Sequence, residues 1–275
     1  EVLWDEYEAF AERDLSGFEV EYLFLDAVYE SLRQQGGGKE GVLCAWAICA
    51  DGRKVMLHLA LGNRESYANW LEFLRDMVRR GLRAPVLVTT DGSPGLMRAV
   101  EEVFPNSLRQ RCLAHKTRNV TDKVPDSVRA EIKNAVRAAY YAPNREVADM
   151  IAADVLKTYQ RDYPAAMRSF QDDWEACVVY LRCPAIHHKR IRTTNLLERS
   201  FLEERRRTRT IPRFFSEKSC LKLVFATLWR ASQRWQGVKM SEIERQQLKL
   251  LRRELGLLPD GTQDVIGPKS QQLAA

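Results

Sequence analysis

The chain has 275 residues, of which 45% are hydrophobic and 29% are charged, and its formal net charge is +6. These values exclude a disordered chain, and the length suits one large domain or one domain that carries a sizeable insertion. No apolar run approaches the roughly 18 residues of a membrane span, and the first residues lack the basic and apolar regions of a signal peptide.

The first part of the chain predicts alternating strands and helices. Five apolar runs are typical of strands and lie over residues 20–28, 41–49, 55–61, 86–90 and 107–113. Asp51-Gly52 is a strong signal for a two-residue hairpin turn, so the second and third strands should be antiparallel. Helical periodicity predicts helices over 66–80 and 95–104.

From about residue 121 the pattern changes, and helical spacing dominates as far as residue 183. We expect a basic loop over 186–194, a helix that carries Glu198, and two further helices over 216–235 and 241–255. The fold class is therefore α/β, with a ribonuclease-H-like mixed sheet, an all-helical insertion and C-terminal helices. The expected parts are residues 1–120, 121–185 and 186–258, followed by a flexible tail over 259–275.

Three carboxylates lie where strands or a helix could bring them to one point. Asp26 ends the first apolar run, Asp91 ends the fourth, and Glu198 opens a basic helical pattern. Each aspartate alone has an ordinary reading as a strand end or a turn. Together they predict a site for two divalent metal ions, because buried acids need a compensating charge and hard oxygen ligands select Mg²⁺ or Mn²⁺. Such a site can transfer phosphoryl groups on a nucleic-acid backbone.

Glu203 and Glu204 compete with Glu198 for the third position, but they lie among arginines and can pair with them. Glu198 shares a helical stripe with Asn195 and Arg205, and we prefer it.

The basic excess is concentrated around this third acid. Residues 187–213 contain nine Lys or Arg and three Glu, a difference of six that equals the net charge of the chain. The basic residues are Lys189, Arg190, Arg192, Arg199, Arg205, Arg206, Arg207, Arg209 and Arg213. This segment is typical of a surface that meets a polyanion, and the ordinary alternative is a solvated helix face.

The six cysteines show no CxxC pairing and indicate a reducing cytoplasm. Cys112 and His115 form a single CxxH, and only His187-His188 could complete the four ligands of a structural zinc. We therefore expect Cys112 and His115 to support the metal site. Three polar residues that follow directly could meet phosphates: Lys116, Arg118 and Asn119.

Four ordered motifs carry a resemblance to a known family. They are Leu25-Asp26-Ala27, Thr90-Asp91-Gly92, Gln110-Arg111-Cys112-x-x-His115-Lys116-x-Arg118-Asn119 and Thr194-Asn195-x-x-Glu198-Arg199. In this order the set resembles the Mutator-type transposases of bacterial insertion sequences, from about Tyr22 to Leu255.

The resemblance implies a ribonuclease-H-like catalytic domain in which Asp26, Asp91 and Glu198 bind two Mg²⁺ ions, with Mn²⁺ as a substitute. It implies cleavage at terminal inverted repeats and attack of the freed 3′-hydroxyl on DNA, through a circular intermediate and by a dimer on two ends. Transposon-end and target DNA are the implied partners, without a membrane or a small-molecule substrate. The expected DNA contacts are Lys116, Arg118, Asn119, Lys189, Arg190, Arg192, Asn195, Arg199, Arg205, Arg206, Arg207 and Arg209.

Family members also carry N-terminal helical DNA-binding modules. The chain begins with Glu1 rather than Met and shows no such module, so we expect a fragment that recognises its ends poorly alone. The expected location is the bacterial cytoplasm, at the nucleoid. Two alternatives stay open: a ribonuclease-H-like nuclease that acts by hydrolysis alone, and a non-catalytic DNA-binding derivative.

Overall fold

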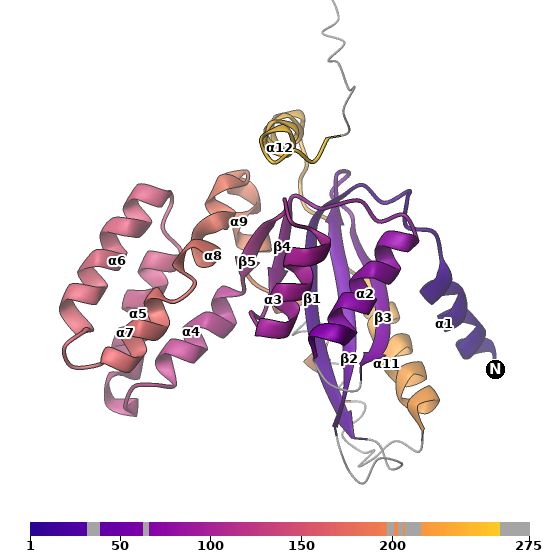
Figure 1. The fold of residues 1–275 in the computed structure, drawn as a ribbon, viewed down its shortest axis with the longest axis horizontal. Coiled ribbons are helices and arrows are strands. Elements are labelled where there is room, and N and C mark those ends of the chain that lie inside the picture. Colours follow the sequence, from indigo (N-terminus) through magenta and orange to yellow (C-terminus); the bar gives the residue numbers. More distant parts are fainter. Residues whose placement is uncertain (32–38, 63–65, 197–200, 203–205, 207–215, 259–275) are drawn as a thin grey trace, which may run out of the picture.

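The computed structural model describes the chain except residues 32–38, 63–65, 197–200, 203–205, 207–215 and 259–275. Five strands form one mixed sheet in the order β3-β2-β1-β4-β5 (Figure 1). The strands are β1 (Val20–Ser31), β2 (Lys39–Cys49), β3 (Lys54–Gly62), β4 (Leu87–Thr90) and β5 (Leu108–Arg111). β2 is antiparallel to both β1 and β3, whereas β4 runs parallel to β1 and β5 parallel to β4. All five predicted strands are confirmed.

The hairpin between β2 and β3 differs from the predicted two-residue turn. Cys49 N donates to Arg53 O at 2.9 Å and Gly52 N donates to Cys49 O at 2.8 Å, so the loop holds three residues, Ala50 to Gly52. Gly52 has φ +85°, the left-handed conformation that ends this type of loop. The sequence signal identified the glycine correctly but gave a loop that is one residue too short.

The two faces of the sheet are covered by different helices. Alternation along β1 places Leu23 and Leu25 in one core with Trp70 of α2 (Tyr67–Arg79), which lies beside α3 (Pro94–Val103). Tyr22 and Phe24 belong to the opposite core, which includes α11 (Glu217–Ser232) and α1 (Val2–Glu12). The helices predicted over 66–80, 95–104 and 216–235 are confirmed, but α1 was not predicted.

The predicted all-helical block is confirmed, and it lies beside β5 at one edge of the sheet (Figure 1). Its helices are α4 (Leu113–Thr121), α5 (Asp126–Tyr140), α6 (Arg145–Tyr159), α7 (Pro164–Gln171) and α8 (Trp174–Val178), followed by the 3₁₀ turn η1 (Val179–Arg182). Tyr140, Phe170 and Trp174 pack together in its core, with ring centroids 5.3 to 5.8 Å apart.

The basic loop expected over 186–194 is instead mostly helical. It forms η2 (Ala185–His187) and α9 (His188–Ile191). Pro184 precedes η2, and its carbonyl accepts a hydrogen bond from His187 N at 2.9 Å, which closes the first turn. The prediction was wrong here because the charges of this segment are typical of a loop but do not prevent short helical turns.

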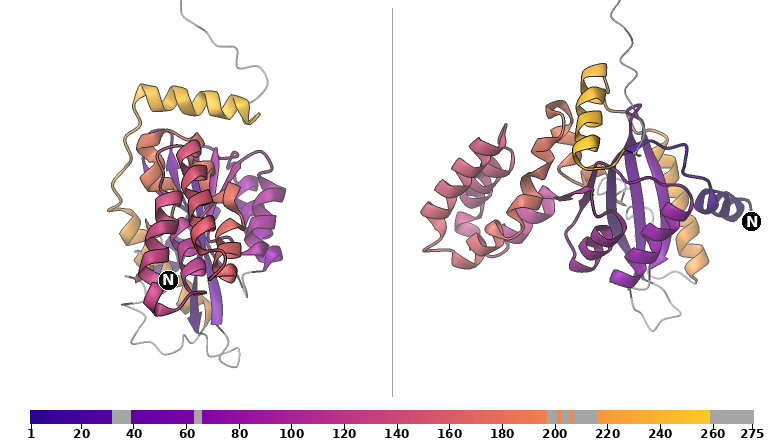
Figure 2. Two further views of the ribbon diagram at one scale, coloured as in Figure 1. Left: turned by 90° about the vertical axis from the view of Figure 1, so that its left-hand side faces the viewer. Right: turned by 45° about the horizontal axis from the view of Figure 1, so that its top comes forward.

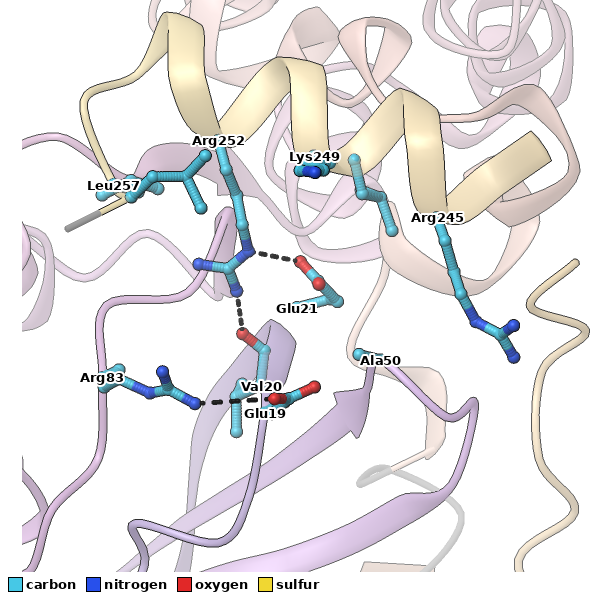
Figure 3. A pocket seen from close by; sticks show the side chains of 11 residues that line it. Glu19, Val20, Glu21, Ala50, Arg83, Arg245, Lys249, Arg252 and Leu257 are labelled. Atoms are coloured by element: carbon cyan, nitrogen blue, oxygen red, sulfur yellow. Dashed lines mark hydrogen bonds and ion pairs between the residues drawn. The ribbon is translucent and has the colours of Figure 1, made fainter. Parts of the chain in front are cut away.

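The last described helix, α12 (Glu242–Glu254), lies across one end of the sheet (Figure 2). Arg252 of α12 donates to Glu21 Oε2 at 3.0 Å and to Val20 O at 2.6 Å (Figure 3). It also donates to Ala84 O at 3.1 Å. Arg252, Glu21 and Val20 line a cavity of about 340 Å³ beneath the helix. The helix is thus attached where β1 begins. No helix in the part of the chain that the structure describes is long and apolar enough to cross a membrane.

Candidate active site

Asp26 lies on β1, and Asp91 follows directly after the last residue of β4, the parallel neighbour of β1. In the ladder between β1 and β4, Phe24 is opposite Thr89. Asp26 follows Phe24 by two residues and Asp91 follows Thr89 by two, so both acids reach the same level of the sheet. Strand alternation gives each acid the face of the residue two positions before it. The register therefore brings Asp26 and Asp91, two of the three predicted acids, to the same level on neighbouring elements of the sheet.

Asp26 is buried, with 8% of its surface exposed. Its Oδ1 accepts a hydrogen bond from Ala27 N at 2.9 Å, and its partner across the ladder with β2 is Cys44. Burial, and next the negative charge of Asp26, raise the pKa of the Cys44 thiol, so this cysteine stays protonated and inert. A buried carboxylate beside a second acid is costly unless a cation compensates both.

Asp91 begins a tight turn between β4 and α3. Its Oδ1 accepts from Ser93 N at 2.9 Å, and Thr90 Oγ1 accepts from Gly92 N at 3.2 Å. Gly92 has φ +87°, and a Cβ there would lie 2.4 Å from the Cζ atom of Arg111. Only glycine suits this position, because both the backbone conformation and the approaching guanidinium exclude a side chain.

The end of β5 connects this turn to the helical block. Gln110 is fully buried; its Nε2 donates to Cys177 O at 3.1 Å and its Oε1 accepts from Tyr180 N at 3.0 Å. Arg111 Nη1 donates to Gly92 O at 3.1 Å and to Asp173 Oδ2 at 2.8 Å. No role was predicted for Gln110 and Arg111, although two polar residues within a predicted strand were a signal.

Cys112 connects the same strand end to the segment that leads to Glu198. Its Sγ accepts from Thr194 N at 3.3 Å and from Thr194 Oγ1 at 3.4 Å, while Arg192 O accepts from Leu113 N at 2.9 Å. Burial raises the pKa of the Cys112 thiol, but hydrogen bonds and charge from His115, together with Thr194, outweigh burial and lower the pKa. Thr89 Oγ1 also donates to Ile191 O at 2.7 Å. The segment before Glu198 is thus fixed beside Asp91.

Zinc remains the less favoured interpretation of the CxxH. Both nitrogens of His187 have partners: Nδ1 lies 2.7 Å from Tyr22 Oη and Nε2 lies 3.0 Å from Lys239 O. His188 Nε2 lies 2.8 Å from Cys183 O. Within the described ranges, no group of three or more His, Cys, Asp or Glu could hold a metal ion. Glu198 lies outside those ranges, so the predicted triad is only partly described.

The donors that the structure does place together fit a hard cation. Asp26 and Asp91 offer carboxylate oxygens, which Mg²⁺ and Mn²⁺ prefer. The nearby sulfur of Cys112 is already engaged by Thr194. Asp26 and Asp91 would hold such an ion together with Glu198.

The residues expected to contact DNA have different environments. Lys189, Arg190, Arg118, Asn119, Asn195 and Arg206 are exposed. Arg192 is half-buried, with its guanidinium 3.9 Å from the ring centroid of Tyr141. Lys116 is only 2% exposed and its ammonium donates to Asp172 O, so it connects α4 to the turn before α8 rather than facing solvent. Four of the expected contacts lie outside the described residues: Arg199, Arg205, Arg207 and Arg209.

Comparison with known proteins adds a family to this geometry. The sequence profile described as "Transposase, Mutator family" matches residues 1–238. The chain is 36% identical over 196 residues to the transposase for insertion sequence element IST2 of Acidithiobacillus ferrooxidans, covering 71% of this chain and 66% of that protein. It is 34% identical over 234 residues to the IS6120 transposase of Mycolicibacterium smegmatis, covering 85% and 72%. The match to the ISRM5 transposase of Rhizobium meliloti is 35% over 228 residues, covering 82% and 57%. The chain thus spans between 57% and 72% of the length of these relatives.

Proposed function

Because the chain belongs to the Mutator family of transposases, we propose that it cleaves DNA at the ends of an insertion sequence and joins the freed 3′-hydroxyl to target DNA. The observation that carries the proposal is the position of Asp26 on β1 and of Asp91 at the end of the adjacent parallel strand β4, with Thr194 of the segment before Glu198 bonded to Cys112. The names of the relatives support the same activity.

The topology supports a ribonuclease-H-like catalytic domain. Three antiparallel strands in a row, with two parallel strands on the β1 side, form the order β3-β2-β1-β4-β5. In this order β1 is central and β4 is its parallel neighbour, so the acids come from the interior of the sheet. A site on rigid central strands holds its ligands more precisely than a site on loops.

In the proposed mechanism, the protein supplies positions and charge. Asp26, Asp91 and Glu198 would hold two Mg²⁺ ions, which when bound stabilise charge on the attacking and leaving oxygens. Thr194, through Cys112, fixes the start of the segment that delivers Glu198. Exposed cations such as Lys189 and Arg190 would bind DNA phosphates and orient the cleaved bond. Family membership also supports the proposal that two copies act together on two transposon ends.

Asp91→Asn tests the catalytic assignment. We expect Mg²⁺-dependent cleavage of element-end DNA to fall by about 1000-fold, because a lost metal ligand removes several kcal/mol of transition-state stabilisation. DNA affinity should change little. Asp51→Asn is the matched control, since Asp51 lies in an exposed hairpin loop and pairs with Arg53. Cleavage at the normal rate by Asp91→Asn would sink the assignment.

A second assay separates strand transfer from simple hydrolysis. An element end with a pre-cut 3′-hydroxyl is incubated with target DNA and Mg²⁺. Joined products support the transposase, whereas cleavage without joining favours a hydrolytic nuclease. DNA binding without either reaction favours a non-catalytic derivative.

A further inference from the structure

The side chain of Arg111 contacts both the Asp91 turn and the helical insertion. Its Nη1 donates to Gly92 O at 3.1 Å and to Asp173 Oδ2 at 2.8 Å. Gly92 belongs to the turn that begins with Asp91, and Asp173 lies between α7 and α8 of the insertion. One guanidinium nitrogen therefore joins the turn that holds Asp91 to Asp173, which lies 62 residues after Arg111 in the sequence.

Asp173 is held in an unusual conformation for this contact. Its φ is +60°, and it is the one residue other than glycine with positive φ in the described part of the chain. Aspartate tolerates this region better than most residues, yet the conformation persists only where the surroundings impose it. Its carboxylate lies between Arg111 at 2.8 Å and Lys116 Nζ at 3.7 Å, and Lys116 also donates to Asp172 O. Two cations from different elements thus fix the Asp173 turn.

The contact is also close on the side of Gly92. A Cβ on Gly92 would lie 2.4 Å from Arg111 Nη1, so the guanidinium lies directly against the backbone of the turn. Among the described residues, Arg111 Nε is buried without a hydrogen-bond partner. A buried donor without an acceptor is unfavourable for stability, so the bonds of Nη1 to Gly92 O and Asp173 Oδ2 have to offset this cost.

We propose that Asp173 of the helical insertion, acting through Arg111, positions the Asp91 turn for metal binding. Arg111 and Asp173 are positioning residues rather than metal ligands. The inference rests on the proposed function, because it takes Asp91 as a ligand. The physical basis is that groups behind a ligand fix its orientation, and their loss commonly weakens metal binding by 10- to 100-fold. Through this contact the position of the insertion becomes a condition for a well-formed site.

The test is a titration of the whole chain with Mn²⁺ in the absence of DNA. Electron paramagnetic resonance measures the free ion at each step and gives the Kd. We expect Arg111→Ala to raise the Mn²⁺ Kd about tenfold and Arg111→Lys to raise it less, because lysine keeps the charge. Asp173→Asn should give a smaller rise, since Arg111 keeps its bond to Gly92. The double variant should bind no more weakly than Arg111→Ala alone, because both substitutions break one connection. Arg109→Ala is the matched control, since Arg109 lies on the same strand and pairs with Glu101 at 3.7 Å.

The outcomes separate this inference from the function on which it rests. If Asp91→Asn weakens Mn²⁺ binding but Arg111→Ala and Asp173→Asn do not, the positioning role is overturned and the metal site stands. Effects of the two substitutions that multiply in the double variant also overturn it. If Asp91→Asn itself leaves Mn²⁺ binding unchanged, the proposed function fails. Thermal unfolding of each variant identifies any that do not fold, and Arg111→Lys and Asp173→Asn then still test the proposal.

Discussion

Two buried carboxylates on the same strand have opposite surroundings. Glu21, near the start of β1, is 7% exposed and pairs with Arg252 of α12 at 3.0 Å. Asp26, five residues further along, is 8% exposed and lies beside a strand that delivers a second acid, Asp91. Near the start of β1 an acid pairs with Arg252, whereas further along the strand two acids come to the same level of the sheet. Burial alone therefore does not separate a structural acid from a candidate metal ligand, and the position of a second acid has to be considered as well.

Stability should fall most when Arg252, the cation that pairs with Glu21, is removed. Arg252→Ala leaves Glu21 buried without its partner and frees the carbonyls of Val20 and Ala84. We expect the free energy of unfolding in urea to fall by about 3 kcal/mol. Arg245→Ala, at an exposed residue of the same helix that pairs with Glu242 at 3.8 Å, should change it by less than about 0.5 kcal/mol. Equal effects of the two substitutions would mean that Arg252 does not compensate Glu21.

A smaller change in the free energy of unfolding is expected for Asp26, and it should appear only when Mg²⁺ is present. Asp26→Asn should remove the stabilisation that Mg²⁺ gives the wild-type chain, about 1.4 kcal/mol at a concentration ten times the Kd. Urea unfolding with Mg²⁺ and with a chelator measures this difference. Glu21→Gln should keep the Mg²⁺-dependent part intact. A Mg²⁺ effect that survives Asp26→Asn would place the metal elsewhere.

The smallest effect is a change in the pH dependence of stability. Burial raises the pKa of Glu21 above its ordinary value, although Arg252 lowers it again in part. The folded state therefore binds more protons than the unfolded state, and this group's contribution to stability is lost as the pH rises from the ordinary glutamate range through the raised value. We expect Glu21→Gln to make the wild-type decline over that range shallower. Unfolding free energies measured between pH 4 and pH 7 test the sign, and a steeper decline would contradict it.

Much of the fold follows from local patterns in the sequence. Apolar runs and helical spacing predicted the five strands and most of the helices, because the signals for a strand, a cap or a turn lie within a few residues. Asp26 and Asp91 each end an apolar run. The two runs form adjacent parallel strands, so the two acids lie at the same level of the sheet.

The rest of the site depends on contacts between distant segments. Gln110 reaches Tyr180 across 70 residues, and no local pattern shows this. Lys116 was predicted to contact phosphates because it is basic and follows the CxxH motif, but its ammonium donates to Asp172 O inside the protein. Glu198 lies outside the described residues, so its convergence with the two aspartates stays a prediction.

The contact between Arg252 and Glu21 spans 231 residues, almost the whole described chain. A ribosome releases β1 early and α12 late, so the sheet can pair its strands long before the cation for Glu21 exists. Until then Glu21 lacks its partner, and the central strand lacks the helix that covers its end. Completion of this domain therefore waits for α12, and a chain that stops before Arg252 is exposed to the quality-control proteases that remove incompletely folded proteins.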